Sequence, residues 1–298
     1  MTDLKDIVRF SRIETNGIHL HVVEAGPAEG PPVFLIHGFP EFWYGWRNQI
    51  APLAERGFHV IAPDQRGYNL SDKPKGIASY DLDQLAADVV GLADHFGLET
   101  FAVAGHDWGA SVGWWLAGQH ADRLRRLAVL NAPHPAVWRE AMLHDPAQKR
   151  KSGYVRLFQV PFLPEFLIGL DRSRALSKGF RDSVRPNAFT EADLEQYRKA
   201  WAQPGASTAT IHYYRALWRK RFLPGAAYRV DSPVLAIWGE RDAYATPELA
   251  EASVRLCAEG RVVRLPQSTH WVQHDEPERV TDLLAEFLWM PNVRRHSP

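Results

Sequence analysis

The hydrophobic residues of the chain fall into short runs that are separated by longer amphipathic stretches. The first two runs, residues 7–14 and 18–26, flank Asn16-Gly17, a dipeptide typical of tight β-hairpins, and predict an antiparallel pair of strands. Helical stretches separate the later runs, so we expect an α/β fold with a mostly parallel eight-stranded sheet flanked by helices. The six later runs are VFLIH (33–37), HVIAP (59–63), FAVAG (101–105), LAVLN (127–131), VLAIWG (234–239) and RVVRLP (261–266).

The helical stretches carry recognisable end signals. Residues 81–97 begin at Asp81, which suits an N-cap, continue with Gln84 three positions later, and stop at Gly97. A closing helix is expected at residues 276–290, because its acidic and proline residues suit an N-terminal turn.

The strand pattern is interrupted between residues 134 and 226. This segment is rich in Arg, Trp, Tyr, Phe and Pro, shows no strand pattern, and contains a helix start with Thr190 as N-cap and Asp193 at the third position. We therefore expect a helical cap at residues 134–226, inserted between two parts of one α/β core, residues 1–133 and 227–298.

Composition narrows the class of protein. The 298 residues are 45% hydrophobic, enough for a substantial core, and Lys+Arg and Asp+Glu both total 35. A net charge of zero provides no global field that would attract nucleic acid or an anionic membrane. The single Cys257, the start without an apolar signal core and the absence of a membrane-length apolar run predict a cytoplasmic protein without disulfides or a membrane span.

The stretch AGHDWGA (104–110) carries the first chemical signal. Many hydrolases place a catalytic serine at the centre of such a turn between a strand and a helix, and here the position holds Asp107. An aspartate side chain has a reference pKa of about 3.9, so it is anionic at neutral pH and attacks without a base. Attack on an ester or amide would give a reactive anhydride, whereas attack on a saturated carbon gives an ordinary alkyl ester. The expected substrate is therefore an epoxide or a haloalkane.

Hydrolysis of such an ester needs a base that activates water. His270, in PQSTHWVQHDEPE (266–278), follows the last predicted strand, and Asp242, in IWGERDAYATP (237–247), follows the preceding one. The order nucleophile, acid, histidine is typical of α/β-hydrolases. We therefore predict His270 as the general base and Asp242 as its orienting acid.

The ester carbonyl also needs an oxyanion hole. The stretch IHGFPE (36–41) follows the third predicted strand, and Gly38 lets the backbone approach closely. The backbone N–H groups of Phe39 and Trp108 are the predicted donors to the oxyanion. Pro40 is compatible with a cis Phe39–Pro40 bond in a tight turn.

Five motifs together resemble the epoxide hydrolase branch of the α/β-hydrolase superfamily, over almost the whole chain. They are HGFPEFWYGWR (37–47), DQRGYNLSDKP (64–74), GHDWGA (105–110), WGERD (238–242) and THWVQHDEP (269–277). The resemblance implies an α/β-hydrolase fold, Asp107 as nucleophile, His270 as base and Asp242 as its partner, with no cofactor and no metal. Asn69 stands where the family pattern RGYG has its last glycine, a departure that concerns local turn geometry.

The same resemblance implies two cap tyrosines that protonate the opening epoxide oxygen. SGYVRLFQVPFLPE (152–165) offers Tyr154, and IHYYRALW (211–218) offers Tyr214, with Tyr213 in the position of the family's tryptophan and His212 in that of its asparagine. The choice between Tyr213 and Tyr214 as second donor stays open. Trp108, Phe39 and Tyr213 are expected to contact substrate.

The preferred prediction is a hydrolase that converts a small-molecule epoxide and water to a vicinal diol. The alternative is a haloalkane dehalogenase with the same triad, which is disfavoured because Phe39 stands where many of those enzymes have a halide-binding asparagine. A fluoroacetate dehalogenase is disfavoured further, because Trp108 and Ser111 stand where that group of enzymes would have arginines. A non-catalytic receptor of this fold would be expected to lack a triad residue, and a serine esterase would need a serine at the elbow.

Overall fold

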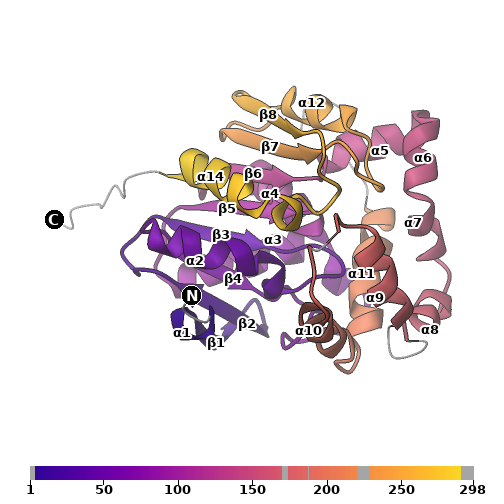
Figure 1. Ribbon diagram of the computed structural model, residues 1–298, viewed down its shortest axis with the longest axis horizontal. Helices are drawn as coiled ribbons and strands as arrows, with labels where there is room; N and C mark the ends of the chain where they lie inside the picture. The colour runs from indigo at the N-terminus through magenta and orange to yellow at the C-terminus, as the bar shows by residue number, and fades with distance from the viewer. Residues whose placement is uncertain (1–3, 170–173, 187, 221–228, 290–298) are drawn as a thin grey trace.

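One mixed β-sheet organises the molecule. The computed structural model describes residues 4–169, 174–186, 188–220 and 229–289 (Figure 1). The sheet has eight strands in the order β1-β2-β4-β3-β5-β6-β7-β8; β2 pairs antiparallel with β1 and β4, and every other pair is parallel. The strands are β1 (Arg9–Thr15), β2 (Ile18–Ala25), β3 (Pro32–Ile36), β4 (His59–Pro63), β5 (Phe101–His106), β6 (Leu124–Leu130), β7 (Val234–Gly239) and β8 (Gly260–Leu265). The predicted α/β fold with an eight-stranded, mostly parallel sheet is confirmed.

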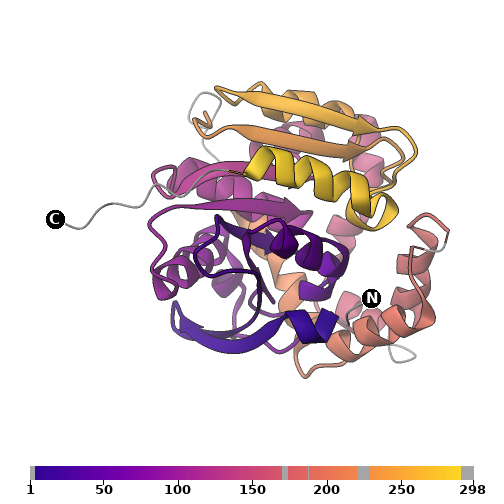
Figure 2. The same cartoon turned by 60° about the vertical axis from the view of Figure 1, so that its left-hand side comes forward.

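Two helical layers cover the sheet, as the apolar strands require. Along β5, Phe101 and Val103 belong to the apolar cluster on one face, whereas Ala102 and Ala104 belong to the cluster on the other. The helices α3 (Leu82–His95) and α4 (Trp108–Gln119) pack on the first face, and α2 (Arg47–Glu55) and α14 (Pro277–Leu288) pack on the second. Figure 2 shows β1 and β2 at the opposite edge of the molecule from β7 and β8. The remaining core elements are α1 (Leu4–Ile7), η1 (Trp43–Trp46), η2 (Ile77–Tyr80), α12 (Glu248–Val254) and α13 (Val272–Asp275).

Local signals predicted in the sequence form the expected contacts. Asn16 and Gly17 both have positive φ angles, 47° and 74°, and pair Thr15 with Ile18 in a two-residue hairpin. The Asp81 side chain accepts a hydrogen bond from the Asp83 amide at the start of α3, and Gly97 follows its end with φ of 66°. The closing helix α14 ends at Leu288, and Met290 of the expected helix lies outside the described residues.

A group of helices, which we call the cap, is inserted between β6 and β7. It covers the carboxyl ends of the strands (Figure 1). The reciprocal capping box of Thr190 and Asp193 begins α10, as predicted. The proposed boundary at residue 226 falls in 221–228, outside the described residues. The cap helices are α5 (Pro135–His144), α6 (Pro146–Lys151), α7 (Gly153–Leu157), α8 (Leu163–Gly169), α9 (Arg174–Asp182), α10 (Glu191–Trp201) and α11 (Ala206–Arg219).

Each of these helices falls short of a membrane span. In the described part of the chain, no helix combines the length and the apolar character that crossing a bilayer requires.

Candidate active site

Asp107 lies at a sharp turn between β5 and α4. Its backbone has φ of 51° and ψ of −116°, a conformation that non-glycine residues rarely adopt and that sets the side chain above the sheet edge. The turn needs small neighbours: a Cβ on Gly109 would lie 1.9 Å from the Ile36 carbonyl oxygen, and one on Gly38 would lie 2.3 Å from the Asp107 Cβ. The small residues around the predicted nucleophile are therefore required by backbone packing.

The two carboxylate oxygens of Asp107 meet different partners. Oδ1 accepts a hydrogen bond of 2.8 Å from the Phe39 amide, and Oδ2 lies 3.6 Å from His270 Nε2. The Phe39–Pro40 bond is cis. Trp108 is the first residue of α4, where backbone N–H groups have no partner inside the helix. Both predicted oxyanion donors thus flank the carboxylate that would become the ester.

His270 and Asp242 form a buried pair behind Asp107. His270 Nδ1 lies 2.8 Å from Asp242 Oδ2, and both residues are at most 3% exposed. Asn131 Nδ2 donates to the same Asp242 oxygen at 2.7 Å, while the Tyr244 amide donates to the other at 2.6 Å. These bonds fix the carboxylate, which in turn sets the orientation of the imidazole.

The electrostatics of this pair depend on Asp107. Burial lowers the pKa of His270, but the Asp242 and Asp107 carboxylates outweigh burial and raise it to about 10. Burial raises the pKa of Asp242. The charge of His270 and its hydrogen bond lower this pKa by more, so the pKa of Asp242 lies below its ordinary value. With both carboxylates charged, His270 therefore holds a proton at neutral pH.

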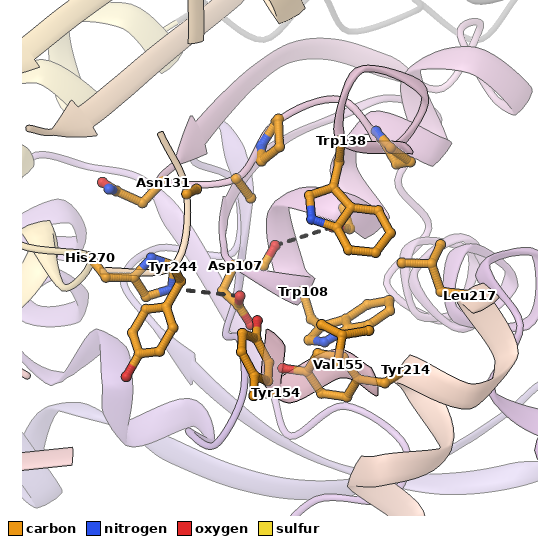
Figure 3. A pocket seen from close by; sticks show the side chains of 15 residues that line it. Asp107, Trp108, Asn131, Trp138, Tyr154, Val155, Tyr214, Leu217, Tyr244 and His270 are labelled. Atoms are coloured by element: carbon orange, nitrogen blue, oxygen red, sulfur yellow. Dashed lines mark hydrogen bonds and ion pairs between the residues drawn. The ribbon is translucent and has the colours of Figure 1, made fainter. Parts of the chain in front are cut away.

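Two cap tyrosines face Asp107. Tyr154 of α7 and Tyr214 of α11 have ring centroids 5.8 Å apart, and the Tyr214 ring contacts the rings of Trp108 and Phe39. Figure 3 shows both tyrosine side chains close to Asp107, with His270 on another side of it. Burial is the main cause that raises the pKa of each phenol, and the Asp107 carboxylate raises both further. The hydroxyls therefore stay protonated and are available as donors.

Tyr213 points away from this site. Its hydroxyl donates a 2.8 Å hydrogen bond to the Arg66 carbonyl oxygen, and its ring packs against Tyr68 and Trp108. Tyr213 lines neither of the cavities at Asp107. The expectation that Tyr213 contacts substrate is corrected: neighbouring residues of a helix point in directions about 100° apart, and the cavity receives Tyr214.

Two cavities, of ≈ 260 Å³ and ≈ 70 Å³, meet at Asp107. Their common lining is Asp107, Tyr154, Tyr214, Tyr244 and His270. The larger cavity continues between aromatic and aliphatic side chains, and the smaller one lies toward α5 and the end of β6. The further lining of the larger is Phe39, Pro40, Phe158, Leu176, Gly179, Phe180 and Trp271, and that of the smaller includes Trp108, Ser111, Asn131, Trp138, Val155 and Leu217. An apolar ligand with its reactive carbon at Asp107 could extend both ways.

Several site residues escaped sequence reasoning. Asn131 directly follows β6 and Tyr244 lies in the loop after β7, and that position at the carboxyl edge of the sheet was the available signal. Glu41 is buried and accepts hydrogen bonds from Tyr197 Oη at 2.8 Å and Gln273 Nε2 at 3.0 Å, and it also pairs with His274 and His106. His106 in turn contacts the His270 carbonyl oxygen, so it connects Glu41 to the loop that carries His270.

The fold and the aspartate elbow define an α/β-hydrolase with a carboxylate in the nucleophile position. Residues 31–277 match the family model described as alpha/beta hydrolase fold. The chain is 44% identical over 283 residues to the Bacillus subtilis (strain 168) protein named AB hydrolase superfamily protein YfhM, covering 95% of this chain and 99% of that protein. It is 36% identical to Epoxide hydrolase 2 of Caenorhabditis elegans, over 93% of this chain and 79% of that protein.

A solved structure of an epoxide hydrolase from Bacillus megaterium, in complex with an inhibitor, matches with a TM-score of 0.85. The identity is 30%, over 93% of this chain and 99% of that chain. The protein belongs to the alpha/beta hydrolase fold family, in its epoxide hydrolase branch.

Proposed function

We propose that this protein hydrolyses epoxides to vicinal diols through a covalent ester on Asp107. The observation that carries the proposal is the pair of protonated phenols, partly buried Tyr154 and buried Tyr214, at the cavity that holds the aspartate. A halide leaves as a stable anion, whereas an opening epoxide produces an alkoxide that needs a proton. Two phenols at the site match the second requirement, and the names of the relatives support it.

The first step opens the ring. An oxygen of the Asp107 carboxylate attacks one epoxide carbon, forms a C–O ester bond, and breaks the bond from that carbon to the ring oxygen. The ring oxygen takes a proton from the phenol pair, Tyr154 and Tyr214. Asp107 needs no base for this attack, so the protonated state of His270 does not impede it.

The second step hydrolyses the ester. Esterification removes the negative charge on Asp107 that helps to raise the pKa of His270, so that pKa falls and His270 releases its proton. This proton replaces the one that the phenol pair gave to the ring oxygen, so both phenols are protonated again. Neutral His270 then takes a proton from water as the water oxygen attacks the Asp107 carbonyl carbon.

The tetrahedral intermediate carries an oxyanion that the Phe39 and Trp108 amides would stabilise; the Phe39 hydrogen bond to Asp107 Oδ1 and the position of Trp108 at the start of α4 support this role. Its collapse breaks the bond between the Asp107 carbonyl carbon and the alkyl oxygen, and the departing diol oxygen takes the proton from His270. The Asp107 carboxylic acid that the collapse leaves then gives its proton to neutral His270, which restores the carboxylate and the protonated imidazole of the starting state. Asp242 holds His270 in the orientation that this transfer requires.

A substrate panel tests the proposal. Styrene oxide, a bromoalkane of similar size and an activated aryl ester are assayed for diol, halide and acid, with Asp107→Ala as the matched inactive variant. Diol formation from the epoxide that disappears in Asp107→Ala is expected. Faster release of bromide than of diol would favour the haloalkane dehalogenase, and turnover of none of the three would favour a non-catalytic receptor.

A further inference from the structure

The cap carries six exposed apolar side chains within the segment 157–167. We call this set the outer cap face, and it spans α7, α8 and the turn between them. Phe162 is 84% exposed and Phe166 is 64% exposed, values that are unusual for aromatic rings in a group. On α8, positions 163, 166 and 167 fall on one side of the helix. The outer cap face consists of Leu157, Val160, Phe162, Leu163, Phe166 and Leu167.

A buried arginine fixes the outer cap face in position. The guanidinium of Arg215, on α11, donates to the carbonyl oxygens of Phe158 and Val160, both at 2.9 Å, and pairs with the Glu165 carboxylate at 2.5 Å. Phe162 adopts φ of 63°, a left-handed conformation that is costly for a bulky residue. The segment is therefore held with its apolar side chains outward, and it does not fold them back onto the cap.

Charge is separated between the cap region and the rest of the chain. Residues 131–233 contain 17 Lys and Arg against 9 Asp and Glu, a surplus of eight positive charges, while the remaining residues contain 18 against 26. Arg150 of α6 and Arg156 of α7, which precede the outer cap face in the chain, are exposed, and in the described part of the chain neither forms an ion pair. Although the net charge of the whole chain is zero, the segment that contains the outer cap face is therefore positively charged.

The outer cap face lies on the reverse of the helix that lines the site. The helices α6, α7 and α8 form the margin of the cap farthest from the sheet (Figure 1). Tyr154, Val155 and Phe158, on α7 and directly after it, line the cavities at Asp107. The same short segment therefore presents one side to the substrate cavity and the other to the surroundings.

We propose that the outer cap face docks on the surface of an anionic lipid bilayer. Aromatic and aliphatic side chains enter the boundary between headgroups and acyl chains, and neighbouring arginines attract anionic headgroups. The protein lies on the bilayer and does not span it. A second copy of the chain fits this face less well, because a symmetric contact would bring two positively charged caps together. Docking would place the cap where apolar molecules concentrate, but it does not depend on the reaction at Asp107.

Vesicle flotation of the full chain tests the proposal. One set of vesicles contains phosphatidylcholine alone, and the other contains phosphatidylcholine and phosphatidylglycerol at a ratio of about 7:3. The wild type is expected to float with the anionic vesicles and to bind the neutral ones at least about tenfold more weakly. Phe162→Ser/Phe166→Ser and, separately, Arg150→Glu/Arg156→Glu should each reduce binding about tenfold or more.

Matched variants control for general effects of the substitutions. Phe10→Ser/Leu70→Ser removes two other half-exposed apolar side chains, and Arg255→Glu/Arg279→Glu makes the same charge change on the core. Both should bind like the wild type. Far-ultraviolet circular dichroism and epoxide turnover without vesicles check that every variant is folded.

Three results would overturn the proposal. These are no flotation of the wild type with anionic vesicles, equal binding to the two compositions, and unchanged binding of both outer cap face variants. Sedimentation velocity adds a further outcome: a wild-type dimer that Phe162→Ser/Phe166→Ser converts to a monomer would show that the face contacts a second copy.

Discussion

The core and the cap contribute to the candidate site in different ways. The core residues Asp107, Asp242 and His270 are positioned by hydrogen bonds from backbone amides and side chains at strand ends. The cap residues Tyr154 and Tyr214 are positioned mainly by the packing of aromatic rings. In the proposed mechanism, the hydrogen-bonded core residues form and hydrolyse the ester. The packed cap residues protonate the leaving oxygen.

The largest expected effect follows from removing the base of the core. His270→Gln should lower steady-state turnover by about 10⁴-fold, because water then lacks its base. Attack by Asp107 should continue, so the ester should accumulate. Intact-protein mass spectrometry after substrate addition measures the adduct. A variant that turns over normally, or that binds substrate and stays unmodified, would show that the two steps are not divided as proposed.

The proposed role of the cap in ring opening is tested by removing the hydroxyls of Tyr154 and Tyr214. Tyr154→Phe and Tyr214→Phe should each slow ring opening by about 10- to 1000-fold, and the double variant should nearly abolish it. The decay of any ester that forms should change much less, because His270 belongs to the core. Pre-steady-state tryptophan fluorescence can separate the steps, since Trp108 adjoins Asp107. Ring opening at the wild-type rate in the double variant would remove the tyrosines from the mechanism.

The charge coupling inside the core predicts a smaller, pH-dependent effect. The pKa of His270 is raised from 6.5 to about 10 in the folded protein, so its interaction with the carboxylates stabilises the fold fully below pH 6.5 and is lost as pH rises toward 10. Asp107→Asn should lower the pKa of His270, and it should therefore reduce the loss of unfolding free energy as pH rises toward 10. Imidazole NMR titration and urea unfolding from pH 6 to about 10 measure both. An unchanged His270 pKa in Asp107→Asn would contradict the coupling.

The smallest effect is expected at the neighbour of a cap donor. Tyr213→Phe removes the hydrogen bond to the Arg66 carbonyl oxygen, so it should cost about 1 kcal/mol of stability. Ring opening should stay within about threefold of the wild-type rate, because Tyr213 lines neither cavity. Urea unfolding and pre-steady-state kinetics provide the comparison. A loss as large as that of Tyr214→Phe would move the second donor to Tyr213.

The same division explains what could be predicted from the sequence. Strand ends meet at one edge of a parallel sheet, so motifs that follow strands brought Asp107, Asp242 and His270 together as expected. The choice between Tyr213 and Tyr214 could not be predicted, because it depends on how α11 is rotated against the core. The role of Asn131 could not be predicted either, because its partner Asp242 is 111 residues away and becomes a neighbour only when β6 pairs with β7.

The outer cap face was missed for a related reason. Its apolar residues resemble those of any packed amphipathic helix, and only the arrangement of α7, α8 and α11 shows which side is uncovered. Total charge was uninformative as well, because opposite surpluses in the cap region and the core cancel.

The central claim is that Asp107 carries the ester, and labelling with heavy-oxygen water tests it most directly. A single turnover with enzyme in excess is run in H₂¹⁸O, and the peptide that contains Asp107 is analysed by mass spectrometry. Because water attacks the carbonyl carbon of the ester, the label should appear in the Asp107 carboxylate. Neither hydroxyl oxygen of the first diol should come from the solvent. Label in the diol together with an unlabelled Asp107 would mean that water attacks the epoxide directly, and it would contradict the account.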